Sequence, residues 1–283
     1  MSDLASLVTD RYGSPPAPGA FGDLVANHTL TTLLAHKSVR QFVLGQALPA
    51  GTLDVLVAAA QSAPTSSNLQ TWSVVAVQDP GRKARLATLC GDQAFVRNAP
   101  LFLLFVADLH RLEKVAEATG QPPGAALAYT ETFLIASLDA AFAAQNVIVA
   151  AEALGLGGCY VGAARNHPRE VAELLGLPPR AVGLFGMALG VPDLTATDDT
   201  PAAAVKPRLP AAEVLHHERW DDNDQAQHFE AYDKVLGVFN ASQQRADQPA
   251  WTARVTTRVA TEAEMHGRHE LRQILNERNF ELK

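Results

Sequence analysis

The sequence has few cysteines, no excess of positive charge and no long uninterrupted apolar segment. Only Cys90 and Cys159 occur among 283 residues, and they form no Cys-x-x-Cys pair. This excludes a disulfide framework, so we expect a cytoplasmic protein with two small buried thiols. Lysine and arginine number 23 against 30 aspartates and glutamates, a net charge of −7. A nucleic-acid binder needs a basic face, so no nucleic-acid partner is expected, although a small cationic pocket for one phosphate is compatible with this balance.

No membrane partner is expected either. The strongest apolar run, residues 101–107, has the length of a strand. The longer segment 133–156 is interrupted by Asp139 and three other polar residues, which is typical of a buried helix in a soluble protein. The N-terminus lacks a basic region followed by an apolar one, so we expect no secretory signal.

Periodicity and turn residues predict one central sheet with helices around it. Proline and glycine in residues 1–22 predict an irregular N-terminal arm before a domain spanning 23–283. Residues 109–123 are expected to be weakly structured. Helices are predicted at 23–35, 52–62, 79–91, 124–154, near 168 and beyond 211, and strands at 72–77, 101–107, 159–162 and 181–189. This mixture indicates an α+β fold.

Several familiar functional motifs are absent from the sequence. Gly155-Leu-Gly-Gly158 lacks the spacing of a dinucleotide-binding fingerprint, because Tyr160 stands where the third glycine belongs and the helix precedes the glycines. A helix end explains these glycines better. There is no P-loop and no Gly-x-Ser-x-Gly elbow. His266 and His269 lack the His-Glu-x-x-His arrangement, so a solvated helix surface is expected and no metal site.

Three polar segments share one kind of chemistry. In an extended His36-Lys37-Ser38-Val39-Arg40, alternate side chains share a face, and cation, hydroxyl and cation suit a phosphate and a polar ring edge. Lys206-Pro207-Arg208 presents two cations on a backbone that proline restrains. Thr65-Ser66-Ser67-Asn68 is rich in hydrogen-bond donors. Each segment alone is also compatible with ordinary surface charge or an ordinary loop.

The order of these segments resembles the nitroreductase superfamily, in particular its NADPH-dependent flavin- and nitro-reducing branch. Five features between residues 28 and 255 carry the resemblance: His36-Lys-Ser-Val-Arg40, the serine-rich loop 63–70, Gly91-Asp-Gln93, Ala144-Gln-Asn146 with the glycine-rich stretch up to Gly162, and Lys206-Pro-Arg-Leu-Pro210. The resemblance implies a nitroreductase-like fold with a mostly antiparallel sheet flanked by helices. It further implies FMN as cofactor and an intertwined homodimer with both flavins at the subunit interface.

The resemblance also implies roles for individual residues. His36, Lys206 and Arg208 would hold the FMN phosphate, and Lys37, Ser38 and Arg40 would approach the ribityl chain and pyrimidine edge. The remaining cofactor-binding candidates are Val39, Thr65, Ser66 and Ser67 (expected from the partner subunit), Gln93 at the ring's polar edge, and Tyr160, Val161, Gly162 and Ala163 along the flavin. A backbone N–H near Gly162 would lie close to flavin N5.

Physical reasoning supports two catalytic candidates. A guanidinium such as Arg40 stabilises the negative charge of a reduced flavin. A backbone N–H at Gly162 is a rigid donor that adds no bulk over the ring. Close packing between strand and helix explains Gly162, Ala163 and Ala164 equally well. Arg165 and Asn166 are expected to close the loop and cap the next helix.

The implied activity is two-electron, ping-pong hydride transfer from NAD(P)H through FMN to a nitroaromatic, a quinone or free flavin. In the segment 239–247 only Arg245 is a candidate for the NADPH phosphate, so NADH is also an admissible donor. Residues 1–27 have no counterpart in the family core. Residues 194–204 are expanded and acidic through Asp198 and Asp199, and we expect solvated loops there.

Three other functions remain open at this point. The chain could carry different flavin chemistry, such as dehalogenation, azoline oxidation or flavin fragmentation, or bind flavin without turnover. The third possibility is a cofactor-free hydrolase that uses the serine-rich loop and His36, but the sequence has no recognisable acidic residue to orient the histidine.

Overall fold

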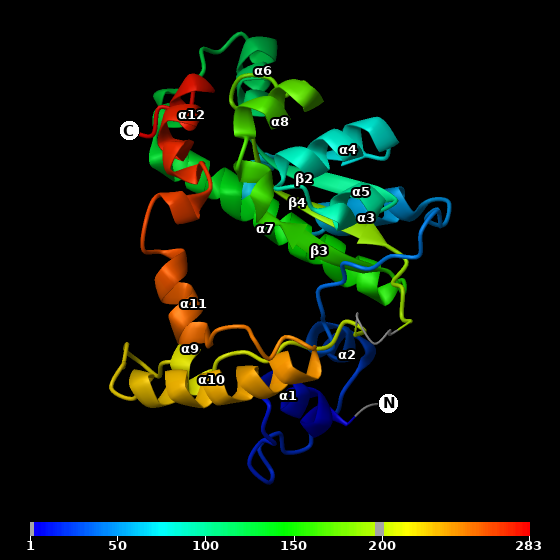
Figure 1. Ribbon diagram of the computed structural model, residues 1–283. Coiled ribbons are helices and arrows are strands. Elements are labelled where there is room, and N and C mark those ends of the chain that lie inside the picture. The colour runs from blue at the N-terminus through cyan, green and yellow to red at the C-terminus, as the bar shows by residue number, and fades with distance from the viewer. Residues whose placement is uncertain (1–2, 196–200) are drawn as a thin grey trace. The chain divides into compact units, whose positions relative to one another are not determined.

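The computed structural model describes residues 3–195 and 201–283 of the chain (Figure 1). They form two compact units, and each is described here by itself. Unit 1 comprises residues up to Ser38 together with Leu194–Glu264, and unit 2 comprises Val39–Asp193 and Met265–Lys283. The acidic pair Asp198 and Asp199, expected in a solvated loop, lies outside the described residues.

Unit 2 is built on a four-stranded sheet. Its strands are β1 (Trp72–Val77), β2 (Leu101–Asp108), β3 (Gly157–Val161) and β4 (Ala181–Gly190), in the order β1-β2-β4-β3 with every neighbouring pair antiparallel. The predicted α+β class and antiparallel sheet are confirmed. Strand β2 is buried on both faces, which explains why its residues are apolar without alternation.

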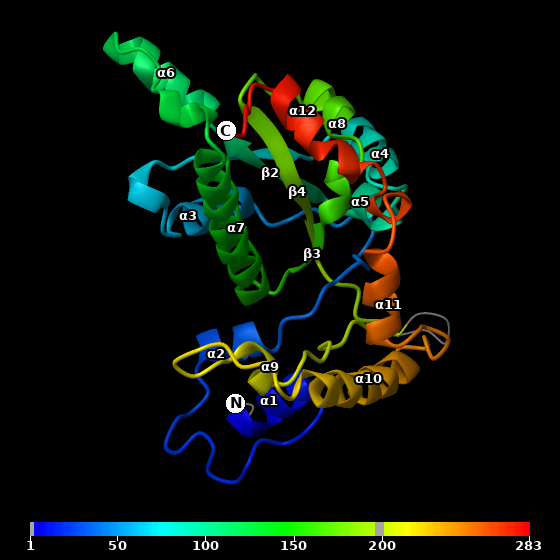
Figure 2. The ribbon, with the colours of Figure 1, turned by 90° about the vertical axis from the view of Figure 1, so that its left-hand side faces the viewer.

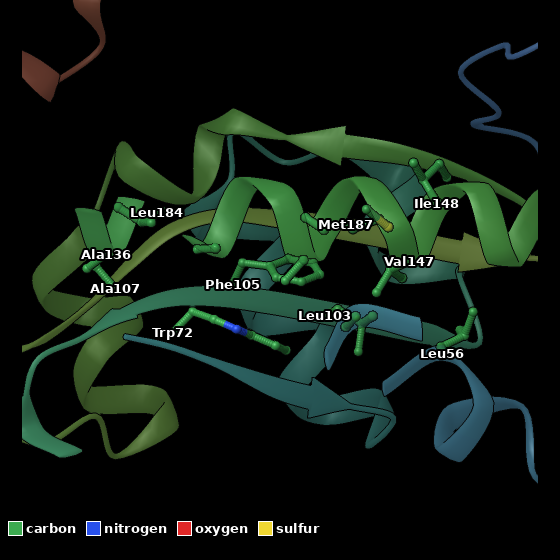
Figure 3. Close-up of a cluster of buried hydrophobic side chains, with 14 of the residues drawn as sticks. Leu56, Trp72, Leu103, Phe105, Ala107, Ala136, Val147, Ile148, Leu184 and Met187 are labelled. Atoms are coloured by element: carbon green, nitrogen blue, oxygen red, sulfur yellow. The ribbon is translucent and has the colours of Figure 1, made fainter. Parts of the chain in front are cut away.

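Helix α7 (Thr130–Ala153) crosses one face of this sheet, and α3 (Thr52–Gln61) packs against α7 (Figure 3). Phe105 and Met187 from the strands meet Val147 from α7 in the main hydrophobic core. Among the described residues, α7 alone is long and apolar enough to span a membrane. Packing against the sheet buries one side of α7, while Leu134, Leu138 and Phe142 on the helix are exposed, so the prediction of a buried helix is confirmed for one side only. The helix begins later than expected, because 125–128 form a separate 3₁₀ turn.

The opposite face of the sheet carries α4 (Pro80–Leu89) and α8 (Pro168–Leu175) (Figure 2). Glycines in β4 make room for large side chains of β2 on this face. A Cβ at Gly186 would lie 2.1 Å from Cζ of Phe102. The remaining elements of unit 2 are η1 (Ser66–Asn68), α5 (Ala94–Asn98), α6 (His110–Thr119), η2 (Ala125–Ala128), η3 (Gly162–Arg165), η5 (Arg268–Glu270) and α12 (Leu271–Glu277).

The prediction of weak structure at 109–123 is wrong, because 110–119 form helix α6. No residue of α6 is buried, although Leu112, Val115 and Ala116 recur at helical spacing along this short, polar segment. Gly120 ends the helix in the left-handed conformation with φ of 69°.

Unit 1 is helical. Its elements are α1 (Leu4–Tyr12), α2 (His28–Leu34), α9 (Ala211–Val214), α10 (Gln225–Ser242) and α11 (Trp251–Arg258), followed by a 3₁₀ turn, η4 (Ala263–Met265), at its end. Helix α2 begins five residues later than predicted, because the Asn27 side chain caps it by accepting from Leu30 N at 2.9 Å.

The prediction of an irregular arm over 1–22 is wrong for residues 4–12, which form α1. Leu4 and Leu7 are buried on one side of this helix, and the proline-rich stretch that suggested irregularity begins only after it. Gly13 ends α1 with φ of 72°, and a Cβ there would lie 2.2 Å from Cγ1 of Val235 on α10. Glycine is therefore required where α1 approaches α10.

Candidate functional site

The three phosphate candidates lie in unit 1, on two backbone segments that Arg11 of α1 connects. The Arg11 guanidinium donates to the carbonyls of Lys206, Leu34 and His36, each at 2.9 Å. The N–H of Arg208 donates to the Arg11 carbonyl, also at 2.9 Å. One residue thus hydrogen-bonds to both cation-bearing segments. Sequence reasoning missed Arg11, since its partners are backbone groups far away in the sequence.

The segment Lys206–Arg208 has the restrained geometry that its proline predicts. Pro207 is buried, and its carbonyl accepts the Tyr232 hydroxyl at 3.0 Å. Burial is also the main reason that the pKa of Tyr232 is raised. Arg208 is exposed, while the Lys206 Nζ lies 6.0 Å from the centroid of the Phe239 ring.

Residues 38–40 have the alternation expected of an extended segment. Val39 is buried and its N–H donates to Gly158 O at 2.9 Å, while Ser38 and Arg40 are exposed. His36 and Lys37 are half-buried. Since the Val39 side chain packs inward and its N–H is bonded to Gly158, its carbonyl is the group that Val39 could offer a ligand.

Arg40 and Gln93 lie close to one short helix, α5. The Arg40 guanidinium carbon is 5.8 Å from the Phe95 ring centroid, and Gln93 precedes the first residue of α5. The Gln93 amide donates to Cys90 O at 2.6 Å. Burial raises the pKa of the Cys90 thiol to about 12, so this cysteine is a packed, unreactive group, as predicted.

The candidates at the end of β3 differ in exposure. Tyr160 is partly exposed, with its ring 5.6 Å from that of Phe185 and its hydroxyl 3.4 Å from Gln145 Oε1. Val161 is buried. Gly162 and Ala163 follow in the 3₁₀ turn η3 and are half-buried.

Packing explains the glycines at the start of β3 and not the one at its end. A Cβ at Gly157 would lie 2.7 Å from Val39 Cγ2, and a Cβ at Gly158 would lie 2.6 Å from Leu189 Cδ2. A Cβ at Gly162 would meet only the side-chain nitrogens of Arg165 and Arg268, at 3.7 and 3.9 Å, which are ordinary contacts. The fold therefore tolerates a side chain at Gly162, and the packing explanation does not account for this glycine.

The residues after Gly162 are structural. Arg165 donates to Leu184 O, and burial lowers the pKa of its guanidinium. Asn166 Oδ1 accepts from Arg268 Nε at 2.9 Å. The expectation that Asn166 caps the next helix is wrong, because His167 occupies the N-cap of α8.

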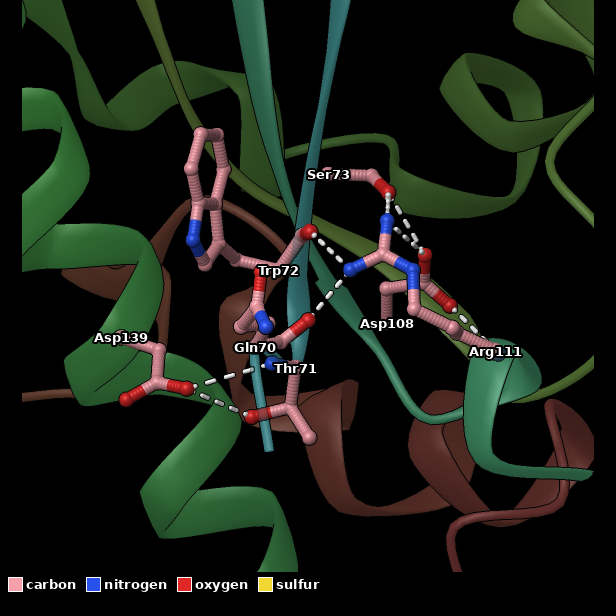
Figure 4. Close-up of polar contacts among 7 residues, drawn as sticks. All are labelled: Gln70, Thr71, Trp72, Ser73, Asp108, Arg111 and Asp139. Carbon is pink, nitrogen blue, oxygen red and sulfur yellow. Dashed lines mark hydrogen bonds and ion pairs between the residues drawn. The ribbon is translucent and has the colours of Figure 1, made fainter. Parts of the chain in front are cut away.

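Asp139 of α7 anchors the serine-rich loop through hydrogen bonds. The Asp139 carboxylate is 1% exposed and accepts from Ser66 N (3.0 Å), Thr71 N (3.2 Å) and Thr71 Oγ1 (3.0 Å). Figure 4 shows its bonds to Thr71. Ser67 and Asn68 have positive φ angles of 49° and 55°, which cost free energy outside glycine.

Arg111 fixes the other side of this loop. It donates to Gln70 O, to Trp72 O at 3.0 Å and to Ser73 Oγ at 2.9 Å (Figure 4). The hydroxyls of Ser66 and Ser67 are exposed and hydrogen-bond to no residue within 3–195 and 201–283. The loop thus presents two available hydroxyls on a restrained backbone. Sequence reasoning treated Asp139 only as an interruption of an apolar segment.

The structure brings some candidates together and leaves others apart. Val39 packs at the start of β3, whose end carries Gly162, and Arg40 lies beside the helix that follows Gln93. Within the described ranges, no hydrogen bond joins the serine-rich loop to these residues. Arg245 is exposed in the connection between α10 and α11.

Comparison with known proteins places this helix-flanked antiparallel sheet in a family. Residues 33–191 match the nitroreductase family model, and residues 206–283 match the model of a nitroreductase family C-terminal domain. The chain is 40% identical over 215 residues to "FMN reductase (NADPH)" of Bacillus subtilis, covering 75% of this chain and 83% of that protein. It is 37% identical over 243 residues to "NADPH-flavin oxidoreductase" of Vibrio harveyi, covering 85% and 94%.

The fold agrees with solved structures as well. The structure of NfrA2 from Bacillus megaterium superposes with a TM-score of 0.82 at 33% identity, covering 91% of this chain and 100% of that one. A helix-flanked antiparallel sheet with this sequence similarity defines the class. The chain belongs to the nitroreductase family, as its motifs predicted.

Proposed function

We propose that the chain is an NAD(P)H-dependent FMN oxidoreductase that reduces nitroaromatics, quinones or free flavin. The observation that carries this proposal is the similarity, over 75–85% of the chain, to two proteins named for NADPH-dependent flavin reduction. Features of each unit, taken separately, support the proposal. Exposed hydroxyls lie on the serine-rich loop, two cation-bearing segments meet at Arg11, and the space at Gly162 is not filled by packing.

Each candidate has a defined task in this proposal. His36, Lys206 and Arg208 hold the phosphate, while Lys37, Ser38 and the backbone of Val39 approach the ribityl chain. Gln93 bonds the ring's polar edge, and Thr65, Ser66 and Ser67 contribute from the partner subunit. Tyr160, Val161 and Ala163 line the ring.

Bound FMN would supply the hydride-accepting centre, and this chain's own groups would orient it. The guanidinium of Arg40 places a positive charge at the pyrimidine edge, where it favours the reduced, anionic form of the cofactor. The N–H near Gly162, directly after the last residue of β3 that pairs with β4, would donate toward the flavin. The open side of Gly162 leaves the ring face accessible to nicotinamide and oxidant in turn.

A homodimer is part of the proposal. Leu134, Leu138 and Phe142 of α7 are 49%, 45% and 46% exposed and recur every four residues, so they form one apolar stripe on the helix. An exposed apolar stripe of this kind is typical of an interface. In the proposed dimer, the serine-rich loop of one copy contributes to the flavin site of the other, as the family resemblance implies. We propose a cytoplasmic location, since both cysteines are buried free thiols.

Anaerobic mixing with NADPH or NADH, followed by the flavin absorbance, tests the activity. Bleaching by at least one nicotinamide, and recovery on adding a nitro compound or a quinone, is the expected result. If neither nicotinamide bleaches the flavin, another flavin chemistry replaces this proposal. Bleaching without recovery by any acceptor would indicate a flavin-binding protein without turnover.

A further inference from the structure

The N-terminal helix α1 has a place in the cofactor site that the family resemblance did not provide. We propose that Arg11 is a positioning residue that holds the FMN phosphate cations in a preformed arrangement. The inference rests on the proposed function, because it takes His36, Lys206 and Arg208 as the phosphate ligands. All residues involved lie in unit 1.

The hydrogen bonds of Arg11 give the first argument. Its planar guanidinium donates to three carbonyls, those of Leu34, His36 and Lys206, which belong to two segments about 170 residues apart in the sequence. Its own carbonyl accepts the N–H of Arg208 at 2.9 Å. A guanidinium presents five donors in a fixed fork, so one side chain can fix several carbonyls at once.

The backbones that Arg11 fixes are those that carry the candidate ligands. His36 and Lys206 each use their carbonyl for Arg11, and Arg208 uses its N–H. Their side chains therefore start from fixed points. Bringing the cations of Lys206 and Arg208 together is unfavourable without an anion, so an anchor that holds their backbones lowers the cost of assembling the site.

The anchor is itself firmly placed. Leu4 and Leu7 bury one side of α1, and Gly13 allows the end of α1 to approach Val235 of α10. The hydroxyl of Tyr232, also on α10, donates to Pro207 O at 3.0 Å. Helices α1 and α10 together restrain Lys206-Pro-Arg208.

Comparing FMN with riboflavin isolates the phosphate and so tests the proposal. After removal of bound flavin, the dissociation constant of each is measured by fluorescence titration for the wild type, Arg11→Gln and Arg11→Lys. We expect Arg11→Gln to weaken FMN binding about 10-fold and to leave riboflavin binding within about twofold, since riboflavin lacks the phosphate. Arg11→Lys should fall between, because an ammonium cannot reproduce the fork.

The matched control is Arg219→Gln. This makes the same change of charge at an exposed arginine of unit 1. This variant should change neither dissociation constant. If Arg219→Gln weakens FMN binding as much as Arg11→Gln does, the loss is explained by net charge alone. Equal weakening of FMN and riboflavin by Arg11→Gln would show a general structural role and overturn the proposal, as would unchanged FMN binding.

A double-mutant cycle with Arg208→Ala adds a test that does not depend on a single variant. If Arg11 acts through the Lys206–Arg208 segment, its replacement should cost less FMN affinity when Arg208 is already alanine. Full additivity would contradict the inference. If wild-type protein fails to prefer FMN to riboflavin, the proposed phosphate site fails, and the inference about Arg11 fails with it. If Arg11→Gln does not fold, the proposal is tested with Arg11→Lys and with the double-mutant cycle that combines Arg11→Lys and Arg208→Ala.

Discussion

Replacing Gly158 and Gly162 separately by alanine distinguishes packing from function at the two ends of β3. A Cβ at Gly158 would lie 2.6 Å from Leu189 Cδ2, 2.8 Å from Ile148 Cδ1 and 3.1 Å from the carbonyl oxygen of Ala188. The backbone oxygen cannot move away as a side chain can. A Cβ at Gly162 makes only ordinary contacts, at 3.7 Å and beyond.

The expected magnitudes follow from these distances. Overpacking of this kind costs roughly 1–3 kcal/mol, so Gly158→Ala should destabilise the protein by about 2 kcal/mol. At about 2–4 °C per kcal/mol for a domain of about 150–250 residues, the Tm should fall by roughly 4–8 °C. Gly162→Ala should change the free energy of unfolding by less than about 0.5 kcal/mol, since nothing in unit 2 must shift.

The rate of flavin reduction should be affected more by Gly162→Ala than by Gly158→Ala, the reverse of the order expected for stability. A methyl group at Gly162 would intrude on the ring face and disturb the N–H donor, so the rate of flavin bleaching by NADPH should fall about 10-fold or more, equivalent to about 1.4 kcal/mol of activation free energy. Thermal unfolding and anaerobic stopped-flow on the two variants provide the measurements. If Gly162→Ala melts as early as Gly158→Ala, or reduces its flavin at the wild-type rate, the assignment of Gly162 to the flavin is refuted.

Three further predictions address other parts of the site. Asp139→Asn should leave a buried donor unsatisfied, at a cost of about 1–3 kcal/mol, and should accelerate amide hydrogen exchange at Ser66 and Thr71. The control is Thr132→Val, which removes a hydrogen bond from the same helix to Ala126 O and should leave that exchange unchanged. Arg208→Ala should increase the loss of FMN during dialysis, and unchanged retention would remove Arg208 from the phosphate site. Leu138→Glu should shift sedimentation toward monomer, whereas the same change at exposed Val115 on α6 should not; a dimer unaffected by Leu138→Glu would place the interface elsewhere.

The sheet and its central helix could be predicted from the sequence because their signals are local. The apolar run of β2 and the long apolar segment of α7 read directly as a buried strand and a buried helix. Helix α6 was missed although Leu112, Val115 and Ala116 recur at helical spacing, because the segment is short and mostly polar and buries no residue. Helix α1 was obscured by the proline-rich stretch that follows it.

The candidate FMN-binding residues could be predicted from the order of the motifs. The residues that anchor the backbone of these segments could not. Arg11 and Asp139 bond mainly to backbone groups, and a backbone group has no signature in the sequence. Their partners lie between 23 and 195 residues away along the chain. The distinction between Gly158 and Gly162 also required coordinates, because both are glycines at one strand and only the neighbouring atoms separate them.

The most direct test of the account is the flavin content of the purified chain. The protein is incubated with FMN, separated from free cofactor by gel filtration, and measured by absorbance together with its molecular mass in solution. The account predicts a yellow dimer that retains equimolar FMN and is bleached by NADPH. A colourless monomer that retains none would contradict it.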